Sequence, residues 1–205
     1  MKKFLINNIR EVNCKKIRNA YIYYNGDYML KILLISIPFL FILGSVLHFA
    51  YNFTNKNKLV GLFSPVNESI FEHSKLLLTP LTLFWIMLYF FKENSVDINN
   101  YFFAMLISIV TSIIVMISFY YTYEGVLGKN KELLNILDLL ISLTIGQILA
   151  NHIYVYSKGI PAIISIILVL IIFILFIYFT YKPLKIPLFI DKKNKTLGIK
   201  EEKLS

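Results

Sequence analysis

The sequence has few charged residues and almost no cysteine. Charged residues make up 16% of its 205 residues, whereas soluble domains carry about 25%. The single cysteine, Cys14, excludes an intramolecular disulfide and a CxxC metal site. The sequence also lacks a P-loop, a GxSxG motif and the glycine pattern of a Rossmann fold. No motif therefore assigns the chain to a nucleotide-binding, dinucleotide-binding or serine-hydrolase class.

Hydrophobic residues are abundant and lie in long runs. They make up 57% of the chain, and its mean hydropathy is +0.66. Runs of about 20 apolar residues can cross the hydrocarbon core of a bilayer as helices. The pattern predicts an all-α integral membrane helix bundle in the cell membrane. Five transmembrane helices are expected, at about residues 30–52, 73–91, 101–122, 133–154 and 160–181. A sixth crossing within 59–91 is the alternative, but polar residues interrupt that stretch too early for two full spans.

Basic residues crowd both ends of the chain. Residues 1–29 predict a basic amphipathic segment on the membrane surface, with a turn at Asn25-Gly26-Asp27 before the first span. Residues 182–205 predict a basic tail that is irregular and solvated. The net charge of +9 therefore favours the lipid bilayer and its anionic headgroups as partners, and not nucleic acid. Five spans place the two basic termini on opposite sides, which conflicts with the positive-inside rule and leaves the orientation open.

A polar segment at 63–75, with the sequence FSPVNESIFEHSK, lies between the first two predicted spans. Ionisable groups beside a membrane span are costly to bury and usually have a function. Ser64 and Pro65 match an N-cap followed by proline at the first helical position. We therefore expect one helix that starts here, with a polar first part, and continues into the second span. On such a helix Glu68 and Glu72 would lie on the same face, four residues apart.

The fourth predicted span is the most polar, and Asp138 lies near its start. With five spans, the end of the first helix and the starts of the second and fourth helices lie on the same side of the membrane. The pattern therefore predicts one main polar cluster on that side and a smaller one at the opposite end of the fourth helix. Besides the candidate metal and catalytic residues, the polar residues expected in these clusters are Tyr51, Asn67, Lys75, Gln147, Asn151 and His152.

Imidazole and carboxylate groups are usual protein ligands of zinc. His48, His73 and Asp138 are therefore candidate ligands for a divalent metal such as zinc. Glu68 and Glu72 are candidate catalytic carboxylates, because a metal held beside them would activate water, as in an intramembrane hydrolase. Two alternatives stay open. The acidic residues could serve proton- or cation-coupled transport, or the polar groups could form a purely structural network between helices.

Several short segments resemble those of a known family. They are LHFAY (47–51), SPVNESIFEHSK (64–75), Asp138 with Gly146-Gln147, and IPLF (186–189). In these segments the chain resembles an uncharacterised bacterial family of small multi-pass membrane proteins, assigned only to a domain of unknown function. The resemblance covers most of the chain and implies packed membrane helices, but no activity. NESIFEH is also similar to the NExxNxxTH segment of the progestin and adiponectin receptor superfamily, which resembles intramembrane zinc hydrolases. The chain has too few spans for that group and lacks its later paired histidines.

Overall fold

The computed structural model describes residues 2–91, 97–128, 132–199 and 202–203, with residues 2–25 and 202–203 described by their backbone. Its long helices are α1 (Lys2–Phe53), α3 (Lys75–Phe91), α4 (Ile98–Leu127), α5 (Glu132–Tyr156) and α6 (Ala162–Tyr181). Within the described residues, five helical segments are long and apolar enough to cross a membrane: Gly26–Phe53, Ile70–Phe91, Ile98–Leu127, Glu132–Tyr156 and Ala162–Tyr181. The prediction of an all-α, multi-pass bundle with five spans is confirmed. The stretch that offered a sixth crossing begins with a single short 3-10 helix, η1 (Val60–Leu62).

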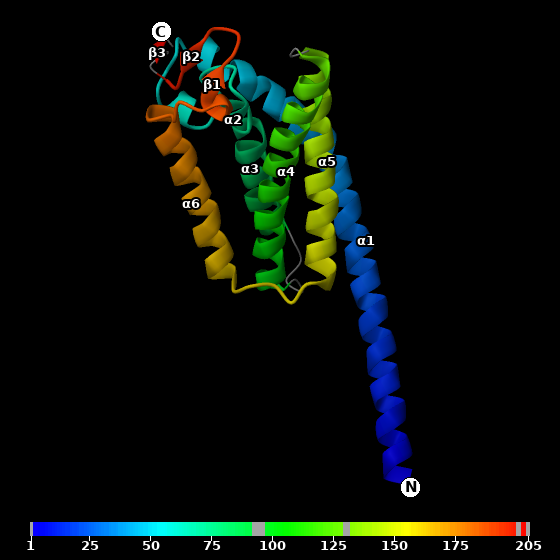
Figure 1. Cartoon of the computed structure of the whole chain (residues 1–205). Coiled ribbons are helices and arrows are strands. Elements are labelled where there is room, and N and C mark those ends of the chain that lie inside the picture. Colours follow the sequence, from blue (N-terminus) through cyan, green and yellow to red (C-terminus); the bar gives the residue numbers. More distant parts are fainter. Residues whose placement is uncertain (1, 92–96, 129–131, 200–201, 204–205) are drawn as a thin grey trace.

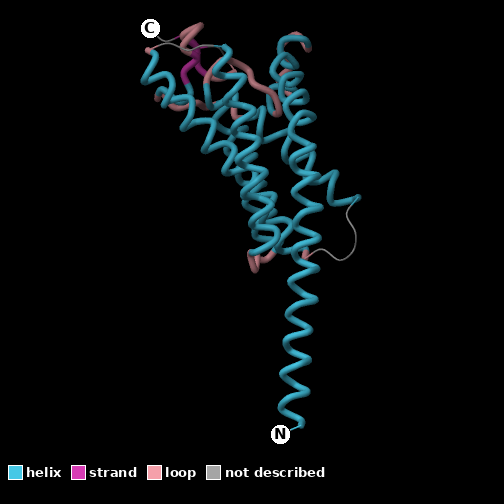
Figure 2. Tube along the Cα trace, turned by 90° about the vertical axis from the view of Figure 1, so that its right-hand side faces the viewer, coloured by secondary structure: helices cyan, strands magenta, loops and turns pink. Residues whose placement is uncertain are grey.

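Helix α1 runs without interruption through Asn25-Gly26-Asp27, so the predicted turn at these residues is wrong. Gly26 serves helix packing instead, because a Cβ atom at this position would lie 2.8 Å from Cγ2 of Val155 in α5. A missing side chain lets two helices approach closely. The N-terminal part of α1 extends beyond the other helices, in line with the first span and away from the C-terminus (Figure 1 and Figure 2).

Helices α4 and α5 pack closely because Gly146 of α5 leaves room for the side chains of α4. A Cβ atom on Gly146 would overlap the Ser112 hydroxyl and would lie 2.8 Å from the Ser108 carbonyl oxygen. Beside this contact the Ser108 hydroxyl donates to the Gln147 amide oxygen (3.0 Å). The Gln147 amide nitrogen donates in turn to the Ser36 hydroxyl of α1 (3.1 Å). Gln147 thus links three helices through hydrogen bonds in the bundle interior, where they add to helix association.

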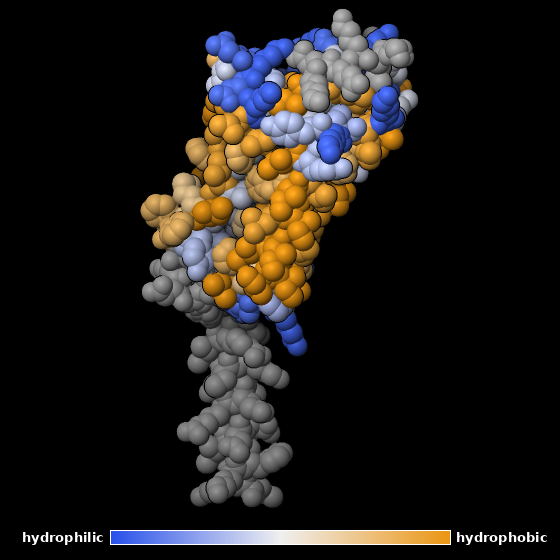
Figure 3. Space-filling model, turned by 90° about the vertical axis from the view of Figure 1, so that its left-hand side faces the viewer, coloured by the Kyte–Doolittle hydropathy of each residue, from blue (hydrophilic) through white to orange (hydrophobic). Residues whose placement is uncertain are grey.

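The outer surface of the bundle is apolar, as expected for contact with lipid. Helix α6 contributes exposed residues along its length, including Ile163, Ile167, Leu170 and Ile174. Figure 3 shows a hydrophobic band across this side of the molecule, with hydrophilic residues above it. The chain is therefore a membrane protein, with hydrophilic residues at both ends of the hydrophobic band (Figure 3).

The C-terminal tail folds back onto the end of the bundle (Figure 1). Its elements are η2 (Pro187–Phe189) and the antiparallel strands β1 (Ile190–Asp191), β2 (Thr196–Leu197) and β3 (Glu202–Lys203), in the order β1-β2-β3. Ile190 lies opposite Leu197 in the first pair. Phe189 and Leu197 are buried, and the Phe189 ring lies 4.5 Å from the ring of Phe71 in α2 (Ile70–His73). The prediction of an irregular, solvated tail is wrong, because these apolar side chains give the tail a surface to bury.

Candidate functional site

The polar segment between the first two spans does not form the single helix that the sequence predicted. Helix α2 has Ser69 as its N-cap, and the Ser69 side chain accepts a hydrogen bond from the Glu72 N–H (3.3 Å). The helix therefore starts after this serine and not at Pro65. The Asn67 side chain accepts from the Ser69 N–H (3.0 Å), which holds the preceding residues in a turn. Glu68 precedes the helix, so the prediction that it shares a helix face with Glu72 is wrong.

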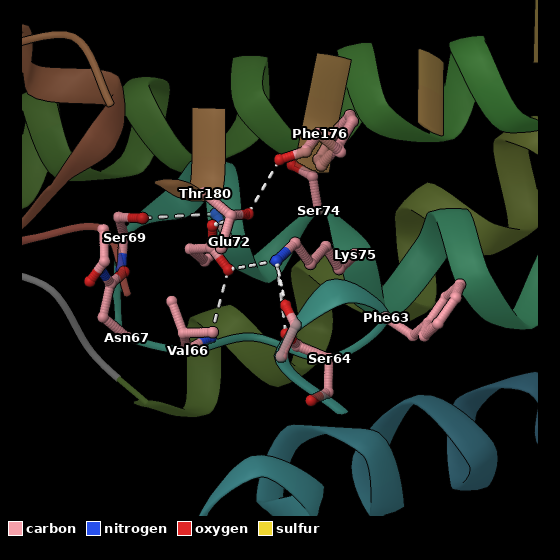
Figure 4. Close-up of polar contacts among 12 residues, drawn as sticks. Phe63, Ser64, Val66, Asn67, Ser69, Glu72, Ser74, Lys75, Phe176 and Thr180 are labelled. Atoms are coloured by element: carbon pink, nitrogen blue, oxygen red, sulfur yellow. Dashed lines mark hydrogen bonds and ion pairs between the residues drawn. The ribbon is translucent and has the colours of Figure 1, made fainter. Parts of the chain in front are cut away.

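Glu72 and Lys75 form an ion pair inside the protein (Figure 4). The Lys75 Nζ lies 2.7 Å from Oε2 of Glu72, and their side chains are 0% and 2% exposed. The Glu72 carboxylate also accepts hydrogen bonds from the Val66 N–H (3.1 Å) and the Thr180 hydroxyl (2.8 Å). The Lys75 ammonium donates to the Gly61 carbonyl (2.7 Å). These bonds join the loop before α2 to α3 and α6, so both residues hold the end of the bundle together.

His48, Glu68 and His73 come together from α1, from the loop before α2, and from α2. The His48 Nε2 lies 3.9 Å from one carboxylate oxygen of Glu68, and the His73 Nε2 lies 3.6 Å from the other. The centroids of the two imidazole rings are 5.1 Å apart. One atom of ligand type from each residue lies within 4.8 Å of the other two. In the part of the chain that the structure describes, this is the one group of three such residues. We call it the His-Glu-His cluster.

Hydrogen bonds orient the His73 ring and hold the backbone of Glu68. The His73 Nδ1 lies 3.1 Å from the Ser69 carbonyl oxygen. A carbonyl only accepts, so Nδ1 of a neutral ring carries the proton and Nε2 keeps a free lone pair. The Glu68 N–H donates to the carboxylate of Asp191 in the tail (3.3 Å), which fixes the backbone of this glutamate. The His48 Nδ1 is buried and has no hydrogen-bond partner among the described residues.

Several cavities adjoin the His-Glu-His cluster, and three of them are also lined by residues of α5. The apolar cavity, of about 430 Å³, is lined by the cluster and mainly by apolar side chains of α1, α3, α4 and α5. The polar cavity, of about 390 Å³, is lined by Glu68, Tyr120, Glu124, Glu132, Asn135, Lys192 and Lys193. The small cavity, of about 20 Å³, lies among residues that include Glu68, His73 and Asp138. Its volume suffices for one water molecule.

Asp138 lies next to the His-Glu-His cluster but is not one of its three members. Its carboxylate is buried, lines the small cavity and accepts a hydrogen bond from the Ser142 hydroxyl (3.0 Å). Of the three predicted metal ligands, the structure thus brings His48 and His73 together. The third member of the cluster is Glu68, which was predicted as a catalytic residue and not as a metal ligand.

The other predicted polar residues are not members of the cluster. Tyr51 is buried against Gly61, where a Cβ atom would lie 3.0 Å from the tyrosine ring. Asn67 makes the turn before α2, and Gln147 makes the hydrogen bonds between α1, α4 and α5. Asn151 and His152 lie near the far end of α5, where the centroid of the exposed His152 ring lies 4.9 Å from that of Tyr156, with the ring planes tilted by 44°.

Sequence reasoning missed three residues around the cluster, Asn135, Asp191 and Lys193. Asn135 precedes Asp138 by three residues on the same helix, and this spacing was a usable signal because such residues share a face. Asp191 and Lys193 belong to the tail, and no local pattern connects them with residues of α1 and α2. Their role depends on how the tail folds back.

The chain belongs to the Family of unknown function (DUF6512), whose model matches residues 23–199. This match confirms the resemblance to a family of unknown function that covers most of the chain. No curated protein and no solved structure matches the chain. Because the function of the family is unknown, the match assigns no activity to the site.

Proposed function

We propose that His48, Glu68 and His73 bind a divalent metal ion, best fitted by zinc, and that the protein is a metal-dependent hydrolase of the cell membrane. The observation that carries this proposal is the convergence of two imidazoles and one carboxylate within 4.8 Å. Catalytic zinc sites commonly have three protein ligands, including two histidines with one glutamate, and keep one position for water or substrate. The adjoining cavities leave space for both.

The distances in the cluster suit an ion between the side chains. In a tetrahedral zinc site with ligand bonds of about 2.0–2.1 Å, neighbouring ligand atoms lie about 3.3 Å apart. His48 and His73 approach different carboxylate oxygens of Glu68, at 3.9 and 3.6 Å, and three ligand atoms, one from each residue, lie within 4.8 Å of one another. Binding of one ion therefore requires the side chains to rotate inward. A direct hydrogen bond between the same atoms would measure about 2.7–3.2 Å.

The hydrogen bond of His73 supports the same proposal. In its neutral form the ring donates its Nδ1 proton to the Ser69 carbonyl and presents the Nε2 lone pair to a carboxylate oxygen of Glu68. Two lone pairs that face each other repel, and a cation between them removes this repulsion. A histidine that donates one ring N–H to a backbone carbonyl and turns the other nitrogen to a metal is the usual arrangement in metal sites.

Asp138 has a suitable place for proton transfer in such a reaction. A divalent ion in the cluster would act as a Lewis acid on water and on the bond to be broken. Asp138 shares the one-water cavity with Glu68 and His73, so its carboxylate accepts the proton of that water. The water oxygen adds to an acyl carbon, the bond from this carbon to the leaving oxygen or nitrogen breaks, and the leaving atom takes up the proton. The products are a carboxylic acid and an alcohol or amine, with no change of oxidation state.

The metal content of the detergent-purified protein tests the proposal. After dialysis against zinc and then against metal-free buffer, the wild type should retain about one zinc ion per chain. His48→Ala, Glu68→Ala and His73→Ala should each lose most of it. His152→Ala is the matched control, because it removes the third histidine of the chain, which is exposed and lies outside the cluster. A folded wild type without zinc, or equal zinc in all four variants, would refute the metal site.

The two alternatives stated from the sequence predict other results. A cation or proton transporter would carry zinc or protons across the membrane of a liposome, and this flux would depend on Asp138. A purely structural cluster would leave the metal content at background, and its variants would lower only the thermal stability. A hydrolase retains zinc and releases product without a measurable flux.

A further inference from the structure

We infer that the substrate is an amphiphile with an acyl chain and an anionic headgroup, and that the apolar and polar cavities bind it as one site. This inference rests on the proposed function, because it names the substrate class of the same site. The two cavities adjoin, because four residues line both of them: Glu68, Glu132, Asn135 and Lys193.

The apolar cavity suits the acyl chain. Its apolar lining consists of Phe41, Phe49, Leu76, Met116, Ile136 and Leu139. Its volume of about 430 Å³ lies within the range of about 300–1,000 Å³ that is usual for ligand pockets. Phe49 and Ile136 belong to membrane-spanning segments and are each 51% exposed. This rim of the cavity therefore faces lipid, and an acyl chain can enter from the membrane.

The polar cavity suits an anionic headgroup. Lys192 is paired with Glu124 on one side of this cavity. Lys193 is the cation that lines both cavities, and Glu68 and Glu132 are the carboxylates that do so. A bound divalent ion and the Lys193 ammonium would carry three positive charges, which balance the carboxylates of Glu68, Glu132 and Asp138 beside them. The ion and the ammonium then serve as two cationic contacts for a phosphate or carboxylate group.

The fold of the tail holds Lys193 at the junction. The Lys193 N–H donates to one carboxylate oxygen of Asp191 (2.8 Å), and the Glu68 N–H donates to the other (3.3 Å). Asp191 is fully buried, so one rigid carboxylate fixes the backbones of both the metal ligand and the headgroup cation. An amphiphile with its head beside Lys193 and its chain in the bundle places the bond between them next to Glu68. The bond that is hydrolysed is therefore the link between acyl chain and headgroup.

Binding of labelled probes tests this inference without any need for turnover. The protein, in nanodiscs of zwitterionic lipid with zinc added, is offered a fluorescent monoacylglycerol phosphate or the uncharged monoacylglycerol with the same chain. Lys193→Glu should weaken binding of the phosphate probe about tenfold or more, as for the loss of a charge-assisted contact. Binding of the uncharged probe should not change. Lys185→Glu is the control, because Lys185 is an exposed lysine of the same tail that lines neither cavity.

A second variant tests the acyl-chain cavity. Ile136→Trp adds bulk at the half-exposed rim, where folding tolerates it, and should weaken binding of both probes. Wild-type binding by both Ile136→Trp and Lys193→Glu would overturn the inference, whatever the metal content. If zinc is absent from the protein while the uncharged probe still binds in an Ile136-dependent way, the cavity assignment stands and the metal site fails. Offering the phosphate probe either in the bilayer or as a short-chain form in water shows whether the source is a membrane lipid or a free amphiphile.

Discussion

Lys75→Met is expected to destabilise the protein strongly, because it leaves the Glu72 carboxylate buried without its cation. The two charged groups are 2.7 Å apart and at most 2% exposed, so water cannot replace the missing partner. Removing one member of a buried ion pair typically costs about 3–5 kcal/mol. The carboxylate keeps its hydrogen bonds from Val66 and Thr180, which offset part of the loss. We therefore expect a decrease near the lower limit, about 3 kcal/mol, in the free energy of unfolding.

The double variant Glu72→Gln/Lys75→Met should recover most of this stability. Replacing both members of a buried pair by neutral groups is often nearly neutral, and the glutamine oxygen still accepts a hydrogen bond. Unfolding in mixed detergent micelles, followed by far-ultraviolet circular dichroism, measures the difference. Lys58→Met, in an exposed loop, is the control. The reasoning fails if Lys75→Met is as stable as this control, or if the second substitution brings no recovery.

Three further predictions concern helix packing and the site. Gly146→Ala should cost about 1–3 kcal/mol in unfolding titrations, because the new methyl group overlaps the Ser112 hydroxyl and lies 2.8 Å from the Ser108 carbonyl oxygen. Gly125→Ala, in α4 with no atom within 4 Å, should not destabilise the protein, because alanine favours a helix over glycine. Asp138→Asn should retain zinc in metal analysis but should no longer release product from the fluorescent monoacylglycerol phosphate. Loss of zinc from this variant would instead indicate that Asp138 is a metal ligand. Asp191→Asn should lower the zinc affinity about 10–100-fold in competition with a chelator, and an unchanged affinity would mean that the tail does not position the site.

The helix bundle and the placement of His48 and His73 at one end of it were predictable from the sequence for a simple physical reason. The thickness of the hydrocarbon core sets the length of an apolar run, so five such runs predicted five spans. The alternation of spans across the membrane then placed His48 and His73 at the same end. The structure shows their rings 5.1 Å apart. The length and alternation of the spans did not predict which other polar group lies with the two histidines.

The assignment of the two glutamates depended on where one helix begins. Ser64 and Pro65 are a strong local signal, but the turn made by Asn67 and the bond from the Glu68 N–H to Asp191 favour another backbone. Asp191 lies 123 positions further along the chain, and no local pattern predicts such a contact. Glu68 therefore lies beside the two histidines, and Glu72 forms an ion pair with Lys75.

The packing of the tail onto the bundle was not predicted because of the composition of the tail. Its many lysines suggested a solvated segment, whereas Phe189 and Leu197 are the residues that anchor it. Two apolar residues among basic ones carry little weight in a composition argument. Phe189 anchors the tail because its ring packs against Phe71 of α2 and Phe179 of α6. Lys193 reaches the cavities as a consequence of this folding.

X-ray absorption at the zinc edge of the zinc-loaded protein is the most direct test of the central claim. The cluster predicts two imidazole nitrogens and one carboxylate oxygen at about 2.0–2.2 Å, with the fourth position taken by water or substrate. In His73→Ala the imidazole contribution should fall by half or the metal should be lost. A sulfur shell at about 2.3 Å, which would point to Cys14, or a shell of oxygens alone that no histidine variant changes, would contradict the proposed site.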